Sequence, residues 1–201
     1  MMTKIKFIII IVVVCMLLIT HRPLYAAGVV TTCDEASLVV ALAGGGVVDF
    51  NIGTDCEIIF TSEKIISTDT TIQNTSNYPV IFSGDYYTPI DTRFLTVNSG
   101  ISLTLDNLTF QHGKALFGGA IYNNGGNLTI RNSAFLYNES TETISTNPGG
   151  GAVYNLQGTA TISDSIFLHN IASQGGAVVY NWNGVLIISE SFITNNTYLD
   201  C

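Results

Sequence analysis

Charged residues are scarce in this chain of 201 residues, at 11% of the total, whereas 47% of the residues are hydrophobic. This composition excludes an intrinsically disordered protein, which needs more charge and less apolar surface. It also excludes a coiled coil, which needs far more alanine, glutamate, lysine and leucine. The chain is therefore expected to fold.

Lysine and arginine are the scarcest charged residues, 7 against 15 acidic residues, so the formal charge is −8. Three of them, Lys4, Lys6 and Arg22, lie in an N-terminal segment that we expect to be removed. The remaining 4 basic residues against 15 acidic ones give a charge of −11. Because phosphate binding needs clustered lysine and arginine, we expect no nucleic-acid partner.

The N-terminal segment has the pattern of a secretory signal peptide. Two lysines precede an uninterrupted apolar run from Phe7 to Ile19, and a polar stretch then leads to small residues. A basic start, a short apolar centre and small residues at the end are typical of a signal peptide, whereas a membrane anchor needs about 20 apolar residues. We predict a signal peptide over residues 1–27, cleaved after Ala26 or Ala27, and an exported protein, secreted or held at the cell surface or outer membrane.

Removal of this segment would leave three of the four cysteines, Cys33, Cys56 and Cys201. In an exported chain an even pair is expected to oxidise. We predict a disulfide between Cys33 and Cys56, which would contribute about 3 kcal/mol on the chain-entropy account. The partner of Cys201 stays open, and two free buried thiols are the alternative to the disulfide.

A repeat dominates the second half of the chain. Gly-Gly-Ala-Ile-Tyr-Asn, Gly-Gly-Ala-Val-Tyr-Asn and Gly-Gly-Ala-Val-Val-Tyr-Asn open three copies, and in each copy a Phe and then an Asn follow the first Gly at the same two distances. The second copy starts further from the first than the third does from the second, and the excess is assigned to an outward loop around residues 142–148. The matched residues are Gly118, Gly119, Phe135 and Asn138; Gly150, Gly151, Phe167 and Asn170; and Gly175, Gly176, Phe192 and Asn195.

Each copy consists of short runs rich in Val, Ile, Thr, Phe and Tyr, separated by Gly or Asn. A period of about 25 residues without helices can bury its apolar side only by stacking copies, which predicts a parallel β-solenoid. We expect the repeated Phe residues to stack inside the coil and the repeated Asn residues to form an amide ladder. The Gly pairs would allow positive φ or close backbone approach at a corner. These roles are structural.

The segment from Asp34 to Ala43 is the one good helix of the mature chain. We expect Asp34 to act as N-cap and a face of Leu38, Ala41 and Leu42 to close the first rung, with the disulfide pinning this lid. The organisation predicted is an N-terminal cap with the first rungs over residues 28–75 and repeats over residues 76–201. No comparable cap follows the last repeat, so we expect a truncated chain, or self-association through that end.

The paired Gly-Gly-Ala-[Ile/Leu/Val] and Phe-x-x-Asn elements resemble the repeats of polymorphic outer membrane proteins. They stand here as Gly118 to Ile121 with Phe135 to Asn138, Gly150 to Val153 with Phe167 to Asn170, and Gly175 to Val178 with Phe192 to Asn195. The chain is also similar to the pectin-lyase-like class of exported bacterial proteins. The resemblance covers residues 33–201. It implies an all-β fold, a right-handed single-stranded parallel β-helix, which the short N-terminal helix would cap, and a surface adhesin or autotransporter passenger.

The sequence favours an exported module with a structural or adhesive binding role over an enzyme. Its partners would be glycans or proteins of a host or neighbouring cell surface. A polysaccharide-active, pectate-lyase-like enzyme is the alternative, but it needs clustered carboxylates for calcium or acid–base chemistry. The acids are scattered, and stacking would bring together only Asp106 and Asp164, while His112 and His169 are interpreted as surface residues. We predict no catalytic, metal-binding or cofactor-binding residues.

Overall fold

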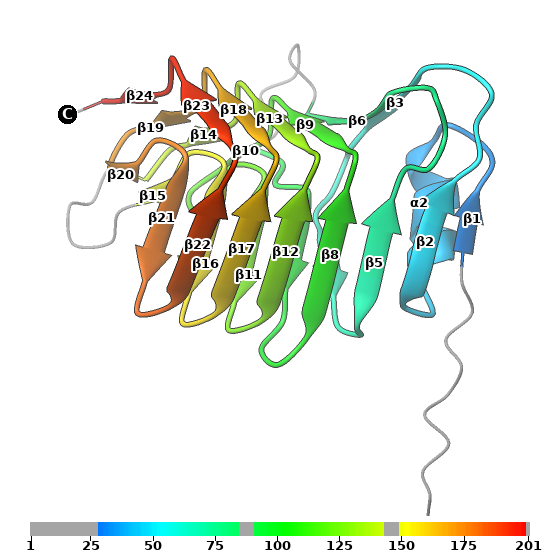
Figure 1. The fold of residues 1–201 in the computed structure, drawn as a ribbon, viewed down its shortest axis with the longest axis horizontal. Coiled ribbons are helices and arrows are strands. Elements are labelled where there is room, and N and C mark those ends of the chain that lie inside the picture. Colours follow the sequence, from blue (N-terminus) through cyan, green and yellow to red (C-terminus); the bar gives the residue numbers. More distant parts are fainter. Residues whose placement is uncertain (1–27, 85–90, 143–148, 200–201) are drawn as a thin grey trace, which may run out of the picture.

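The computed structural model describes residues 28–84, 91–142 and 149–199. In these residues the chain winds as a parallel β-helix, each turn of the coil forming a rung that lies on the one before (Figure 1). Every strand pairing among them is parallel, which confirms the predicted all-β solenoid with one short helix. The predicted signal peptide, the centre of the predicted outward loop and Cys201 lie outside the described residues.

The strands form three long and two short sheets. The seven-stranded sheet holds β1 (Gly28–Val30), β2 (Gly46–Phe50), β5 (Thr70–Gln73), β8 (Ser102–Asp106), β12 (Asn127–Arg131), β17 (Thr159–Ser163) and β22 (Val185–Ser189). The six-stranded sheet holds β3 (Cys56–Ile59), β6 (Val80–Ser83), β9 (Thr109–Gln111), β13 (Ala134–Leu136), β18 (Ile166–Leu168) and β23 (Phe192–Thr194). The five-stranded sheet holds β4 (Lys64–Ile66), β7 (Leu95–Val97), β11 (Ile121–Asn124), β16 (Val153–Leu156) and β21 (Val179–Trp182). The short sheets are β10 (Lys114–Ala115), β14 (Glu139–Ser140), β19 (Ile171–Ala172) and β24 (Thr197–Tyr198), and β15 (Gly149–Gly150) with β20 (Gly175–Gly176).

The helix α2 (Glu35–Leu42) covers the N-terminal end of the coil, as predicted (Figure 1). It begins after Asp34, whose side chain accepts a hydrogen bond of 2.7 Å from the Ser37 N–H and so caps the helix. Leu38 and Ala41 are buried against the core. The Glu35 carboxylate also accepts hydrogen bonds from Thr61, between β3 and β4, which ties the helix to the first complete rung.

The predicted disulfide between Cys33 and Cys56 is present and joins the start of the cap to the first strand of the six-stranded sheet. Replacing both cysteines by serine is expected to lower the free energy of unfolding by about 3 kcal/mol, because the unfolded chain regains the entropy of the loop that the bond closes. Guanidinium denaturation of the oxidised wild type and the double variant measures this difference. An unchanged midpoint would mean that the bond does not hold the cap in place.

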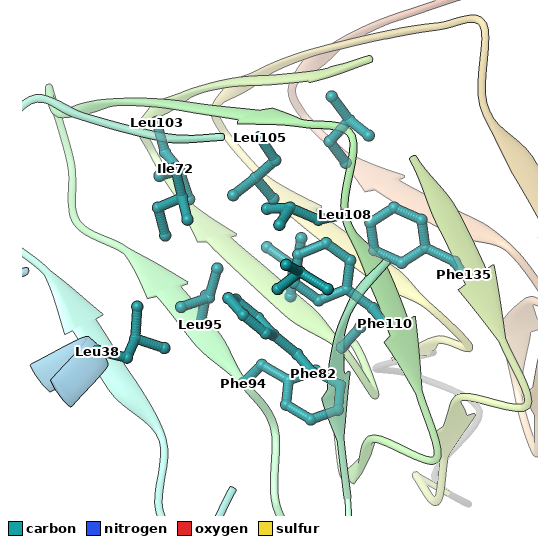
Figure 2. Packing of buried hydrophobic residues seen from close by; sticks show 14 of the residues in the cluster. Leu38, Ile72, Phe82, Phe94, Leu95, Leu103, Leu105, Leu108, Phe110 and Phe135 are labelled. Carbon is teal, nitrogen blue, oxygen red and sulfur yellow. The ribbon is translucent and has the colours of Figure 1, made fainter. Parts of the chain in front are cut away.

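The interior of the six-stranded sheet is a column of aromatic rings. Strand register stacks Phe82, Phe110, Phe135 and Phe167 on successive rungs, and all four are fully buried. The ring centroids of Phe110 and Phe135 lie 4.8 Å apart and those of Phe135 and Phe167 lie 4.9 Å apart. Figure 2 shows part of this column among the surrounding leucines. Adjacent strands are about 4.8 Å apart, so the rings stack at the spacing of the rungs.

In the third copy the structure corrects the predicted alignment by one residue at both ends. Phe167 pairs with Ile193, and Phe192 pairs with Ile166 and is 64% exposed. Gly150 likewise pairs with Gly176, where the sequence match had placed Gly175. The third copy therefore keeps a single displacement from the second throughout, and this displacement also pairs Tyr154 of β16 with Tyr180 of β21. The hydrogen-bond ladder keeps one register within a rung, since a shift of one residue would move every side chain to the opposite face of the sheet.

The last rung leaves apolar side chains in contact with solvent at the C-terminal end of the described coil. They include Val185, Ile188, Ile193, Tyr198 and Leu199. Self-association through this end therefore stays a prediction for which the structure supplies the apolar surface. Among the described residues, no helix has the length and apolar character needed to cross a membrane.

Candidate functional site

The repeated asparagines form an internal amide ladder at the turn after the six-stranded sheet. The Asn138 amide donates to the Asn170 side-chain oxygen at 3.0 Å, and the Asn170 amide donates to that of Asn196 at 2.9 Å. Asn138 and Asn170 are fully buried. The ladder predicted for Asn138 and Asn170 is confirmed, but its third member is Asn196, whereas the predicted Asn195 lies at the preceding corner with a φ of +52°.

A second asparagine ladder runs along the five-stranded sheet and was missed by the sequence analysis. The Asn123 amide donates to the Asn155 side-chain oxygen at 2.7 Å, and Asn155 donates to Asn181 at 2.6 Å. Each amide also donates to the backbone of the glycine that follows shortly after it. The signal was present in the repeated Tyr-Asn pair, to which no role was assigned. Both ladders satisfy their own donors and acceptors, so they hold the rungs together and are not sites for a ligand.

The Gly pairs at the corner before the five-stranded sheet also have structural roles. Gly118 has a φ of +61°, and the Cβ atom of any other residue there would lie 2.1 Å from the backbone oxygen of Ile121. A Cβ atom at position 119 would lie 2.5 Å from the backbone oxygen of Gly151, and one at position 151 would lie 2.0 Å from the backbone oxygen of Ala177. Only glycine allows this approach between rungs, as predicted.

Each lysine and arginine in the described part of the chain is paired with an acid. The pairs are Lys64 with Glu35, Arg93 with Glu63, Lys114 with Glu139, and Arg131 with Asp106. The unpaired charge on the described surface is therefore negative. An anionic ligand would meet no lysine or arginine on these residues that lacks an acidic partner.

The Glu63 carboxylate is the centre of a polar cluster on the outer side of the coil. Burial alone would raise its pKa, but hydrogen bonds from Arg93 and Thr96 and the charge of Arg93 outweigh burial and hold the pKa below its ordinary value. Arg93 also donates to the backbone oxygen of Phe117 at 2.6 Å and lies over the Tyr122 ring. The arrangement joins β4, β7 and β11 across the outer side of the coil, so the carboxylate of Glu63 has a structural role.

This lowered pKa predicts a loss of stability in acid. A carboxyl whose pKa is lower in the folded state stabilises the fold above its unfolded pKa, and this stabilisation is lost as pH falls through the folded value. The free energy of unfolding should therefore decrease below the ordinary glutamate pKa of about 4.3. Urea titrations from neutral pH into the acid range measure it, and Glu63→Gln should make the decrease shallower. An equally steep decrease in that variant would show that other carboxyls, such as Glu35, carry the effect.

The two acids that an enzyme would have needed are kept apart. One Asp106 oxygen accepts a hydrogen bond from the Asn132 amide at 2.8 Å, and the other forms a salt bridge with Arg131 at 2.9 Å, so both oxygens are engaged. Asp164 lies at the corner two rungs further on, in the position equivalent to Asn107 and Asn132. No group of three or more His, Cys, Asp or Glu residues that could hold a metal ion occurs among the described residues.

Two aromatic ladders lie outside the core. His112, Tyr137 and His169 stack at successive corners, with ring centroids 5.6 and 5.0 Å apart, so these histidines are not isolated surface residues. On the outer side of the five-stranded sheet, Tyr154 contacts Tyr122 and Tyr180. Burial, followed by the neighbouring tyrosines, raises the pKa of Tyr154 to about 12. This phenol is 3% exposed, which leaves little ring surface for a ligand.

An exposed apolar surface on the side of the coil is the outer face of β13, β18 and β23. Register places Ala134, Ile166 and Phe192 in one column and Leu136 and Leu168 in the next. We call these five residues the apolar strip. Ile166 is 46% exposed and Phe192 is 64% exposed. Toward β3 the same face is mixed, since Gln111 donates to Glu57 and Ser83 there and Ile59 is exposed. Exposed apolar surface of this kind marks interaction sites.

Comparison of the chain with protein-family models, curated proteins and solved structures found no match. The class of protein is therefore defined by the fold alone, a parallel β-helix with a disulfide-pinned helical cap.

Proposed function

We propose that the protein is an exported β-helix module, secreted or held at the cell surface, with a structural or adhesive binding role like that of polymorphic outer membrane protein repeats. The observation that carries the proposal is the division of residues between the two sides of the coil. Phe135 and Phe167 with Asn138 and Asn170 point inward and hold the rungs. On the outer face of the six-stranded sheet the side chains vary from rung to rung, as at Ala134, Ile166 and Phe192, which is the property of a binding surface on a rigid scaffold.

The disulfide supports export. Bonds such as Cys33–Cys56 form and persist in oxidising compartments outside the cytosol. The basic and apolar N-terminal sequence, with Ala26 and Ala27 at its end, supplies a route to such a compartment. Sites on the exported chain would then face glycans or proteins of another cell or of the surroundings.

Export is tested in the cells that make the protein. Mass spectrometry of the protein taken from the cell surface or medium should find an N-terminus after Ala26 or Ala27, and protease added to intact cells should degrade it. The variant Val13→Arg, which interrupts the apolar run, should accumulate inside the cell with its N-terminal segment intact. Uncleaved, protease-resistant wild-type protein would contradict export.

A polysaccharide-active enzyme of the pectin-lyase-like class is the second candidate, and the parallel β-helix architecture favours it. The engagement of both Asp106 oxygens argues against that residue as a catalytic acid or base. An assay against polygalacturonate with calcium decides between the two, because robust cleavage would replace the binding role.

A further inference from the structure

The apolar strip is bordered on one side by carboxylates that no other residue of the described chain pairs with. The corner between the seven-stranded and six-stranded sheets carries Asn107, Asn132, Asp164 and Glu190 on successive rungs, all with φ between +48° and +56°. Asparagine and aspartate adopt this conformation readily, whereas glutamate does so rarely. The backbone therefore accommodates Asp164, but it gives no reason for the glutamate at position 190.

A shallow hollow lies where this corner meets the apolar strip. Its lining is half apolar, from Pro79, Val80, Leu108, Ala134 and Ile166, and half polar, from Asn107, Thr109, Asn132, Ser133 and Asp164. A hollow that combines apolar groups with a single carboxylate matches a side chain that has an aliphatic stem and a cationic head. Lysine and arginine have that shape, and they bury their stems while keeping the charge at a polar edge.

The opposite border of the strip is aromatic. Tyr137 is 51% exposed at the corner that follows β13, where its ring stacks between those of His112 and His169. Both faces of the ring are therefore covered, so the charge that attracts a cation comes from the border with Asp164 and Glu190. A second copy of this chain is a poor occupant, because each lysine and arginine of its described residues is already paired with an acid.

We propose that the apolar strip is a docking surface for a cationic, amphipathic segment of a partner protein. A lysine or arginine of that segment occupies the hollow with its charge at Asp164, a second cation lies near Glu190, and apolar side chains cover Ile166, Leu168 and Phe192. This inference rests on the proposed binding role, for which it names the surface and the chemistry of the partner.

The test uses the purified protein with its disulfide intact and a short synthetic peptide that alternates lysine and leucine, with blocked ends. Calorimetric titration should detect saturable binding. Replacing every lysine of the peptide by glutamate should abolish binding, and so should replacing every leucine by serine. Binding that tolerates either change, or no binding of the lysine–leucine peptide, would overturn the proposal.

Variants of the protein locate the binding. Asp164→Asn places at the corner the residue that Asn107 and Asn132 already supply there, so it should fold normally and weaken binding about fivefold. Ile166→Thr combined with Phe192→Thr should weaken it about tenfold, since two exposed apolar contacts are lost. Unfolding midpoints verify that each variant is folded.

Matched controls come from β3, at the far end of the same sheet face. Glu57→Gln removes one negative charge and Ile59→Thr removes one exposed apolar side chain, and neither should change the affinity. If Glu57→Gln and Asp164→Asn lowered the affinity for the peptide equally, the overall charge of the protein would explain the binding, and the proposal would be overturned. Sedimentation that finds a wild-type dimer dissociated by the Phe192 change would assign the strip to a second copy instead.

Binding to anionic lipid vesicles that is lost in the same variants would assign the strip to a membrane and would likewise overturn the proposal. Because these measurements use the purified protein, they do not depend on where the protein resides. A protein that is not exported but binds the peptide would refute the proposed function alone. An exported protein that ignores the peptide would refute the docking surface alone.

Discussion

Replacing Asn170 by alanine should destabilise the protein by about 3–5 kcal/mol. The Asn170 side-chain oxygen accepts from both the backbone N–H and the amide of Asn138, each at 3.0 Å. Its amide donates to the backbone oxygen of Phe135 and to the side-chain oxygen of Asn196, each at 2.9 Å. The alanine variant would leave two donors of Asn138 without acceptors inside the coil, where water does not replace them. Chemical denaturation followed by circular dichroism measures the loss.

The matched control is Asn195→Gly. Asn195 precedes the ladder residue Asn196 and has a φ of +52°, which glycine adopts without strain. Its unfolding free energy should stay within about 0.5 kcal/mol of the wild type. If Asn195→Gly cost as much as Asn170→Ala, the ladder would follow the alignment made from the sequence and not the observed pairing.

The sequence predicts the architecture because a stacked coil repeats the same environment in every rung. Equivalent inward positions on successive rungs favour the same residue type. Phe135 and Phe167 therefore recur, and each is followed three residues later by a ladder asparagine, Asn138 or Asn170. The cap was also predictable, since Asp34 and the glycines after α2 are local signals that need no knowledge of the rest of the chain.

The register of the last copy was not predictable from residue identity. Asn195 stands directly before the ladder residue Asn196, and Phe192 stands directly before Ile193, which occupies the buried column after Phe167. An alignment by residue identity therefore selects the residue before the correct one in both cases. In the structure the register is set by backbone hydrogen bonds. The pairing of Thr161 with Ile187 fixes one displacement between the second and third copies for the whole rung.

The candidate site was invisible in the sequence for a different reason. The column of Thr109, Ala134, Ile166 and Phe192 stands one residue before the buried column of Phe110, Phe135 and Phe167, so the spacing of the two columns is the same. What the outer column lacks is a shared residue type, since nothing in the fold requires one there. Only the paired strands reveal that apolar residues gather on three neighbouring rungs beside Asp164.

Replacing Phe135 by alanine should cost about 3–5 kcal/mol of unfolding free energy, the usual range for a large side chain removed from a core. Its ring lies between those of Phe110 and Phe167, with centroid distances of 4.8 and 4.9 Å, and is fully buried. The cavity cannot close, because the strands on both sides are held at the rung spacing by the parallel ladder. Denaturation, with hydrogen exchange of the neighbouring strands β9 and β18, measures the loss and its spread along the coil.

Phe192→Ala is the control for this prediction, since the same substitution then falls on a ring that is 64% exposed. It should change the unfolding free energy by less than about 1 kcal/mol. Ile193→Ala on the same strand tests the register further, because Ile193 follows Phe167 in the column. Ile193 is 46% exposed on this last described rung, so its loss should be modest, but it should still exceed that of Phe192→Ala although fewer atoms are removed. A clearly larger loss for Phe192→Ala would contradict the observed register, and with it the exposed ring that the apolar strip offers to a partner.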